Sequence, residues 1–272
     1  MPQDTGKYRK NTKDQYYTKE SIAEKCIKKI IDMYPNIQTY EWIEPSAGKG
    51  VFLKRLPSTF HVLGIDIEPK YPSIQEADFL TWSPIGDANR IFFGNPPFGR
   101  QSCLAKAFIK HAAKYANIIA FILPRSFIKP SMSRVFPLKF HCVYTCDLEK
   151  NSFEVNNMEH DVPCIFQIWE KRNTLRIISQ KETEIGFQYV KVGEPFHIAC
   201  KRVGGLAGKC YTEGDFNPNY HYFLKLDDIY IPHIQTILEE VNSHTFPTNT
   251  VGPRSLSKGE INEVLNIILI SI

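Results

Sequence analysis

Residues 90–100 read RIFFGNPPFGR. The run at 91–93 is typical of the end of a buried strand, but the two prolines that follow cannot continue it, because each ring fixes φ and removes a backbone donor. The chain therefore leaves the sheet through a rigid loop, with the Asn95 amide before the prolines and the Phe98 ring after them. Acceptors beside a stacking face suit a flat ligand that carries an amino group.

Apolar strands and helices alternate on either side of this loop. TYEWIE, HVLGIDI, RIFFGN and NIIAFIL read as strands, and QSCLAKAFIKHAAKYA reads as an amphipathic helix between the last two. Helical spacing also predicts a helix within residues 17–34, capped by Thr18 or Ser21. This alternation predicts an α/β fold with a mostly parallel sheet, which FHCVYTCDL and VPCIFQIW close as an antiparallel pair joined by a loop.

The pattern changes after about residue 172. FQYVKV, FHIACKRVGG, KCYTEG and HYFLKL read as short strands with polar turns, and two helices are expected near 231–242 and 257–269. The sequence therefore predicts a larger domain over 1–172 and a small α+β appendage over 173–272 that contacts the substrate.

The bulk composition is that of a globular protein, with 43% hydrophobic and 23% charged residues. No apolar run reaches the length of a membrane span, and the start has no signal-peptide core, so we expect an intracellular protein, cytoplasmic or nuclear, with no membrane partner. The 7 cysteines form no CxxC pair and are expected to be reduced thiols. Cys142 and Cys146, beside His141, are read as strand residues rather than zinc ligands, and no metal is expected.

The net charge of +4 is too small to indicate nucleic acid by itself, but basic residues gather in two places. One is the N-terminal arm, and the other is the stretch from 191 to 222, where rings in NYHYF could stack on unpaired bases. Phosphate contact and simple solvation are both open for these side chains. The residues concerned are Lys7, Arg9, Lys10 and Lys13 in the arm and Lys191, Lys201, Arg202 and Lys209 in the second stretch.

Glycines follow the first predicted strand, in EPSAGKG at 44–50. Gly48 and Gly50 allow a sharp turn and a close approach of the backbone to a ligand, and a helix N-terminus after them would suit an anionic group. The spacing is not that of a phosphate-binding Walker loop.

Acids follow the next two segments. Asp66 ends the second strand, where nucleotide-binding sheets hold a ribose, with Glu68 as the alternative. Asp78 could accept from an exocyclic adenine amine while the Phe79 ring packs on the adenine face. Ligands bind at this edge of open α/β sheets, so the segments specify one site together.

In chain order these segments resemble the gamma-class N6-adenine-specific DNA methyltransferases, which use S-adenosylmethionine. The resemblance covers residues 14 to about 170, and its most specific element is NPPF. It implies a Rossmann-like, seven-stranded methyltransferase sheet, mostly parallel with an antiparallel end strand. The matching pieces are DQYYTKESIA, EPSAGKGVF, GIDIEPK, ADFLTW, GNPPFG, ILPRSF and NSFEVNNMEHDVPCIFQIW.

The resemblance also implies roles for single residues. Asn95 and the Pro96 carbonyl would accept from the target amine, Phe98 would stack on the target base, and Phe153 would stack on its other face. The catalytic set is Asn95, Pro96, Pro97 and Phe98. The cofactor set is Tyr17, Thr18, Glu44, Ala47, Gly48, Gly50, Asp66, Ile67, Asp78, Phe79 and Asn95.

The expected activity is direct, in-line methyl transfer to the N6 amine of a flipped-out adenine in nucleic acid, preferably DNA. Alternatives are an adenine in ribosomal or cap-adjacent RNA, a protein glutamine, whose amide an Asn-Pro-Pro-aromatic loop also holds, and a non-catalytic scaffold subunit. The C-terminal part is shorter than the usual target-recognition domain of the family. Cys164 follows a proline, as in cytosine-C5 enzymes, but is expected to be a buried thiol. Homo- or hetero-oligomers both stay open.

Overall fold

The structure, a computed structural model, describes residues 16–155, 158–177, 182–247 and 253–272. The basic N-terminal arm with Lys7, Arg9, Lys10 and Lys13 lies outside these ranges. Contacts divide the chain into two units, 1–178 and 179–272.

The boundary between the units follows Ile178 rather than residue 172. Arg176 explains the difference, because its guanidinium donates to the carbonyls of Ser133, Phe136 and Phe140 and lies 5.1 Å from the Trp169 ring centroid. The segment after the last strand of the large sheet therefore still packs on the first unit.

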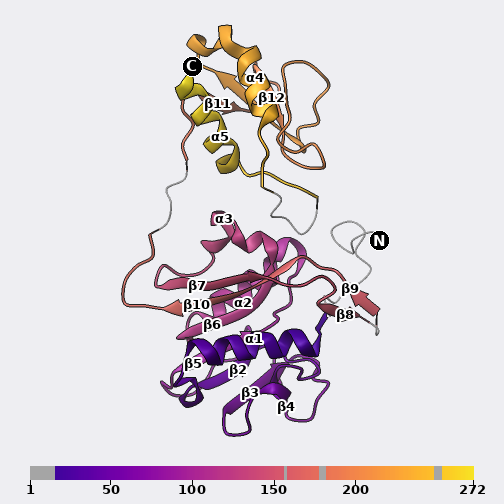
Figure 1. Cartoon of the computed structure of the whole chain (residues 1–272), viewed down its shortest axis with the longest axis vertical. Coiled ribbons are helices and arrows are strands. Elements are labelled where there is room, and N and C mark those ends of the chain that lie inside the picture. Colours follow the sequence, from indigo (N-terminus) through magenta and orange to yellow (C-terminus); the bar gives the residue numbers. More distant parts are fainter. Residues whose placement is uncertain (1–15, 156–157, 178–181, 248–252) are drawn as a thin grey trace. The chain divides into compact units, whose positions relative to one another are not determined.

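A seven-stranded sheet forms the centre of the first unit (Figure 1). Its order is β4-β3-β2-β5-β6-β10-β7, and the neighbours from β4 to β6 pair in parallel. The antiparallel strand is β10, the last of the sheet along the chain, which lies between β6 and the edge strand β7. This order confirms the predicted fold class. The strands are β2 (Glu41–Glu44), β3 (His61–Asp66), β4 (Ile74–Glu76), β5 (Arg90–Gly94), β6 (Ile118–Pro124), β7 (Phe140–Asp147) and β10 (Cys164–Lys171).

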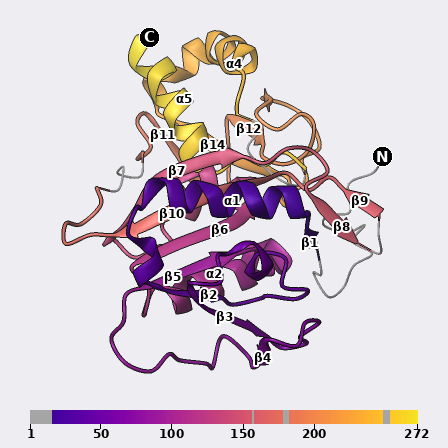
Figure 2. The same cartoon turned by 60° about the horizontal axis from the view of Figure 1, so that its bottom comes forward.

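Helices cover this sheet (Figures 1 and 2). The first begins after Lys19, which lies at its N-cap and makes no side-chain cap bond, so the prediction of Thr18 or Ser21 as the cap was wrong. Thr18 instead belongs to a short strand. The helices are α1 (Glu20–Met33), α2 (Cys103–Ala112) and α3 (Pro130–Ser133), with 3₁₀ turns η2 (Ile37–Thr39), η3 (Leu53–Arg55), η4 (Arg100–Ser102) and η5 (Arg125–Ile128).

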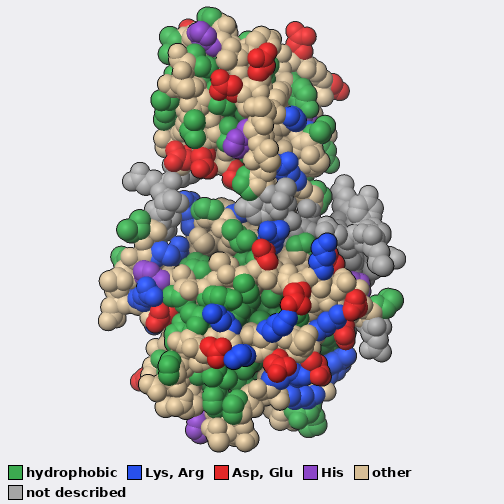
Figure 3. Space-filling view, viewed as in Figure 1, with side chains coloured by type: hydrophobic (Ala, Val, Ile, Leu, Met, Phe, Trp, Pro, Cys, Tyr) green, Lys and Arg blue, Asp and Glu red, His purple; other side chains and the backbone are tan. Residues whose placement is uncertain are grey.

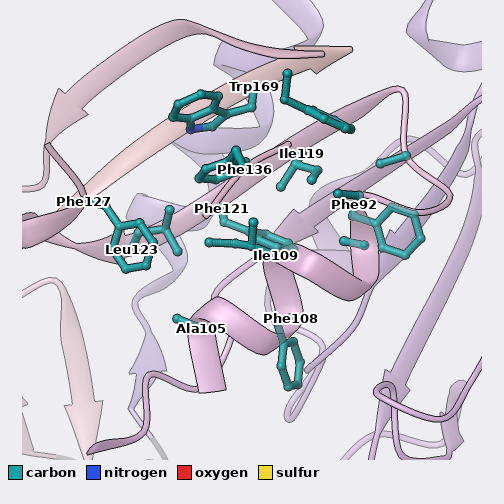
Figure 4. Close-up of a cluster of buried hydrophobic side chains, with 14 of the residues drawn as sticks. Phe92, Ala105, Phe108, Ile109, Ile119, Phe121, Leu123, Phe127, Phe136 and Trp169 are labelled. Carbon is teal, nitrogen blue, oxygen red and sulfur yellow. The ribbon is translucent and has the colours of Figure 1, made fainter. Parts of the chain in front are cut away.

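The strand before the proline loop is buried on both faces. Phe92 packs in the cluster that α2 forms with β6 and β10 (Figure 4), whereas Phe93 contacts Trp42 and Phe52. Successive side chains of a strand point to opposite faces, so one apolar run contributes to two cores. This burial on both faces fixes the position of the end of β5, and therefore the position of Asn95, which directly follows it.

A three-stranded sheet replaces the simple loop expected between β7 and β10. It consists of β1 (Tyr17–Thr18), β8 (Phe153–Val155) and β9 (Met158–His160), in the order β1-β8-β9. Tyr17 pairs with Glu154 and Thr18 with Phe153. The segment before α1 is thereby tied to residues far along the chain.

The second unit is the expected small α+β structure. Its four-stranded sheet has the order β11-β14-β12-β13, and its core joins this sheet to two helices. Ser257 and Glu260 form a capping box at the start of α5. The elements are β11 (Phe187–Val190), β12 (Ile198–Lys201), β13 (Cys210–Tyr211), β14 (His221–Leu226), η6 (Asp228–His233), α4 (Ile234–Ser243) and α5 (Lys258–Ser271).

Two further features concern the described residues only. None of their helices combines the length and apolar character needed to cross a membrane. All seven cysteines are free, and no group of three or more His, Cys, Asp or Glu side chains within the described ranges could hold a metal ion.

Candidate active site

A cavity of about 810 Å³ lies in the first unit where β2, β3 and β5 end. Three loops that are far apart in the sequence meet there, because the carboxyl ends of parallel strands lie on one edge of the sheet. Among the residues expected in the site, Gly50 and Phe153 do not line it. Those that do are Tyr17, Thr18, Glu44, Ala47, Gly48, Asp66, Ile67, Asp78, Phe79, Asn95, Pro96, Pro97 and Phe98.

The glycine loop turns sharply, as the sequence predicts, but only the 3₁₀ turn η3 follows it and not the expected helix N-terminus. Gly48 has φ +50° and Gly50 has φ +71°, a region that side chains rarely adopt. A Cβ on Gly48 would also meet the Tyr17 ring at 3.3 Å. Gly48 therefore lets the backbone turn and lets Tyr17 pack directly on it. Gly50 supports the turn from outside the cavity wall.

Asp66 binds the backbone of two loops. Its Oδ2 accepts from the Gly48 N–H at 2.7 Å, and its Oδ1 accepts from the Glu68 N–H at 2.8 Å. Both bonds are charge-assisted, which makes them stronger than bonds between neutral groups. The acid expected to hold a ribose thus also shapes the site in which the ribose would lie.

Glu44 is a buried carboxyl in the cavity wall, only 2% exposed. Burial raises its pKa well above the ordinary value, the negative charge of Asp66 raises it further, and a backbone hydrogen bond from Leu53 opposes these effects. Its Oε2 has no hydrogen-bond partner. A cation entering the cavity would favour the ionised form of this group.

The NPPF loop presents an acceptor to the cavity. The Asn95 amide donates from Nδ2 to the Tyr16 carbonyl at 3.2 Å, and the Ser46 hydroxyl donates to the Asn95 carbonyl at 3.0 Å. With the amide NH₂ engaged in this way, Oδ1 is buried and unpartnered. No described residue donates to the Pro96 carbonyl. The loop therefore holds two acceptor oxygens beside the half-buried Phe98 ring.

Three buried oxygens without a partner belong to residues of this one cavity wall: Thr18 Oγ1, Glu44 Oε2 and Asn95 Oδ1. Buried polar atoms are nearly always hydrogen-bonded, and leaving one unpaired costs roughly 1–3 kcal/mol. A ligand with donor groups would satisfy them. Three such atoms on the residues of one cavity wall are typical of a binding site rather than of a structural core.

The two residues expected to contact adenine differ in how far they are exposed. Asp78 is exposed, and its Oδ1 accepts from the Leu80 N–H at 2.9 Å. Phe79 is only 1% exposed and packs against Phe108 and His111 in the core, although it reaches the cavity wall. Phe79 can therefore offer only a small part of its surface to a ligand.

Phe153 is not brought into the cavity. It is fully buried, lies opposite Thr18, and contacts the Tyr16 ring edge-on with 6.4 Å between ring centroids. The neighbouring residue of β8, Glu154, lines the cavity instead. Neither Glu154 nor Tyr16 was expected in the site, and adjacency to Phe153 and Tyr17 was their only signal in the sequence.

The three basic residues expected to contact substrate do not form one patch. Lys201 pairs with His221 across the sheet, and the Arg202 guanidinium lies 4.9 Å from the Tyr222 ring centroid. Lys209 Nζ donates to the carbonyl of Asn242 near the end of α4, a contact that stabilises the helix terminus. Alternation places Lys201 and Arg202 on opposite faces of the sheet, which a run of sequence letters cannot reveal.

Cys164 is a buried thiol in β10, as expected, and it does not line the cavity. Burial raises its pKa well above the ordinary value, so it stays protonated. A neutral thiol outside the cavity cannot serve as a nucleophile there.

Basic and acidic side chains are mixed on the face of the first unit seen in Figure 3. The helix α1, which crosses this face in Figure 1, contributes the ion pairs Lys25–Glu149 and Lys28–Asp32. This face is therefore balanced in charge and does not resemble a basic groove for a polyanion.

No protein-family model and no curated protein matches the chain. Solved structures do match it. A candidate RNA methyltransferase from Pyrococcus horikoshii gives a TM-score of 0.46 at 16% identity, over 60% of this chain and 91% of that one. The magnesium protoporphyrin IX methyltransferase of Synechocystis, solved with bound SAM, gives a TM-score of 0.38 at 12% identity, over 56% and 79%. The methyltransferase subunit of a type I restriction-modification system from Streptococcus thermophilus gives 0.45 at 15% identity, over 94% and 57%. At these values, the likenesses carry no conclusion about cofactor or substrate.

Proposed function

We propose that this protein transfers a methyl group from S-adenosylmethionine to the N6 amine of adenine in nucleic acid, with DNA as the preferred substrate. The observation that carries the proposal is the pair of free acceptors, Asn95 Oδ1 and the Pro96 carbonyl, beside the Phe98 ring in a large cavity. This set suits an aromatic amine, which offers two N–H donors in the plane of a ring that can stack.

The cavity residues fit the proposed cofactor. When bound, it would supply an activated methyl group on a cationic sulfonium. Glu44 and Asp66 would provide negative charge on that side, and the unpartnered Glu44 Oε2 and Thr18 Oγ1 would accept from its polar groups. A volume of about 810 Å³ lies within the range of cavities that hold small ligands and cofactors.

The chain's own contribution to the reaction would be positioning. An adenine amine is a poor nucleophile because its lone pair is delocalised into the ring. Two acceptors on its hydrogens would favour a pyramidal nitrogen, whose lone pair could bond to the methyl carbon in line as the carbon–sulfur bond breaks. The methylated nitrogen would then lose one proton to solvent. Holding the amine in that geometry is the kind of preorganisation that accelerates group transfer. The Asn95–Tyr16 and Ser46–Asn95 hydrogen bonds would keep the acceptors in place.

A base in a duplex must leave the stack to reach these acceptors, at a cost of a few kcal/mol. Stacking on an aromatic ring is worth roughly 1–3 kcal/mol per base, so contact with Phe98 would offset much of this cost. Phe153 has no part in the proposal, since it is fully buried.

The test is methyl transfer with a labelled cofactor to duplex DNA, single-stranded DNA, RNA and protein, followed by digestion and identification of the methylated nucleoside or amino acid. N6-methyl-deoxyadenosine from DNA is the expected product. If methyl-adenosine forms from RNA and no product forms from DNA, RNA is the substrate instead of DNA. Methyl-glutamine would overturn the proposal. Absence of labelled product from every substrate, with cofactor bound, would favour a scaffold subunit.

A further inference from the structure

The second unit holds two cations against one aromatic ring. The Arg202 guanidinium lies 4.9 Å and the Lys258 Nζ 5.9 Å from the centroid of Tyr222. Lys258 Nζ is also 3.9 Å from the centroid of Tyr189, whose ring contacts Tyr222 edge-on. We refer to Arg202, Lys258, Tyr189 and Tyr222 as the cation–ring cluster. Its two basic residues are 56 positions apart, so no local sequence pattern reveals it.

The backbone holds both cations in place. The Leu256 N–H donates to the Arg202 carbonyl at 2.8 Å, and Ser255 forms an isolated bridge with Val203. Lys258 is the first residue of α5, directly after the capping residue Ser257. Both basic side chains are thus attached to ordered elements rather than to free loops.

The positive charge of this cluster is not neutralised by an ion pair. Neither Arg202 nor Lys258 makes a salt bridge with any residue in the described ranges. Glu260 is the acid on the same helical turn, and its Oε2 accepts from the Ser257 N–H and hydroxyl in the capping box. Two cations that contact one ring, neither of them in an ion pair, favour the approach of an anion.

The backbone neighbour of Arg202 on the adjacent chain segment carries an exposed ring. The Arg202 N–H donates to the carbonyl of Tyr220 at 2.8 Å, and the Tyr220 side chain is 43% exposed. Cations for phosphates together with a ring for a base are the combination that binds unpaired or distorted nucleic acid. A small free anion would use the cations but not the ring.

We propose that the cation–ring cluster binds backbone phosphates of the polynucleotide substrate. This rests on the proposed function, and it replaces the set Lys201, Arg202 and Lys209 with Arg202 and Lys258. Lys209 is used to hold the end of α4, and Lys201 lies on the other face of the sheet. The cluster therefore assigns one face of the second unit to the substrate.

The experiment compares two double charge reversals of equal size. Arg202→Glu with Lys258→Glu removes the cluster, whereas Lys191→Glu with Lys225→Glu is the matched control. Lys191 and Lys225 are both exposed. Lys225 lies on the opposite face of the four-stranded sheet from the core residue Leu224, because neighbouring side chains alternate along β14. Lys191 lies on that same opposite face, because it shares a shallow pocket with Phe223. Binding of a labelled DNA duplex is measured from 50 to 200 mM salt. Thermal unfolding and cofactor titration of each variant check that both units are intact.

Two lost phosphate contacts should reduce the slope of log affinity against log salt by about 1.8. Over this fourfold range of salt, wild-type affinity should therefore fall about tenfold more than that of the cluster variant. The control variant with Lys191→Glu and Lys225→Glu should retain most of the wild-type slope. Arg202→Gln with Lys258→Gln, which adds no negative charge, should show the same loss of slope and serves if the Glu variant unfolds.

A wild-type slope in the Gln variant, or an equal loss in the control pair, would overturn the cluster as the phosphate site. That result is distinguishable from failure of the proposed function. If wild-type protein neither binds nor methylates any polynucleotide, the function fails; if it methylates DNA and the slopes match, only this inference fails.

Discussion

The Gly48 N–H donates to Asp66 Oδ2 at 2.7 Å, so the acid that ends β3 holds the loop that follows β2. The same carboxylate accepts from the Glu68 N–H at 2.8 Å. A residue expected only to bind a ligand therefore also has a structural task. Substitutions at this position must be read with both tasks in view.

Asp66→Ala should lower both the stability of the first unit and its affinity for the cofactor. Loss of hydrogen bonds to a charged acceptor costs roughly 1.5–3 kcal/mol, reduced where solvent reaches the group. Asp66→Asn keeps one acceptor oxygen and should unfold at a temperature between those of the wild type and the Ala variant. Thermal unfolding and calorimetry with S-adenosylhomocysteine measure the two effects. Wild-type cofactor affinity in the Ala variant would remove Asp66 from the ligand contacts and favour Glu68.

Glu44 should couple cation binding to proton release. Its folded pKa lies well above the ordinary value of 4.5, mainly because it is buried. Above pH 4.5 the unfolded chain gives up this proton while the folded chain keeps it, so this group makes the first unit less stable as pH rises towards the folded pKa. A bound cation favours ionised Glu44, and binding should release up to one proton.

Calorimetry in two buffers of different ionisation enthalpy measures this release, with the cationic cofactor and with neutral-sulfur S-adenosylhomocysteine compared side by side. Glu44→Gln is the matched control and should abolish the buffer dependence that belongs to this site. Equal proton release in the Gln variant would mean that another group titrates.

Asn95→Ala should remove most methyl transfer and leave the fold and the cofactor affinity nearly unchanged. The amide oxygen is one of two acceptors for the target amine, and loss of one preorganised group of this kind typically costs about 10²–10³ in turnover. Asn95→Asp should retain more activity than Asn95→Ala, because it keeps an acceptor oxygen, although it cannot donate to the Tyr16 carbonyl. Single-turnover rates at saturating cofactor give the comparison. Turnover close to wild type in the Ala variant would contradict the mechanism.

Phe98 and Phe153 should differ sharply when truncated. Phe98 lines the cavity, so Phe98→Ala should weaken binding of DNA containing a flipped or unpaired adenine by roughly 1–3 kcal/mol. Phe153 is fully buried, so Phe153→Ala should instead destabilise the first unit by about 3–5 kcal/mol. Phe153→Leu, which leaves a smaller void, should recover most of the stability. Substrate affinity that followed Phe153 rather than Phe98 would reverse the two assignments.

The sequence by itself determined the sheet and the edge at which the site lies. Apolar runs that alternate with helical segments can only be buried as parallel strands covered on both faces, and the prolines at 96 and 97 must end β5. The glycine loop, Asp66 and Asn95 follow strand ends, so local order along the chain was enough to bring them to one cavity. Lys19 at the N-cap of α1 was missed, because no side-chain bond marks that start.

Only the tertiary structure decided which side chains reach the cavity and which charges meet. The small β1-β8-β9 sheet buries Phe153 and turns Glu154 to the wall, and it depends on pairing between segments about 135 residues apart, as between Tyr17 and Glu154. The fold of the second unit brings Arg202 and Lys258 to the same Tyr222 ring, while Lys201 lies on the other face of the sheet. The burial of a side chain and its distance from other charges depend on contacts with residues far along the chain. Local sequence patterns carry little information about such contacts, which is why the unpaired Glu44 oxygen and the cation–ring cluster emerge only in three dimensions.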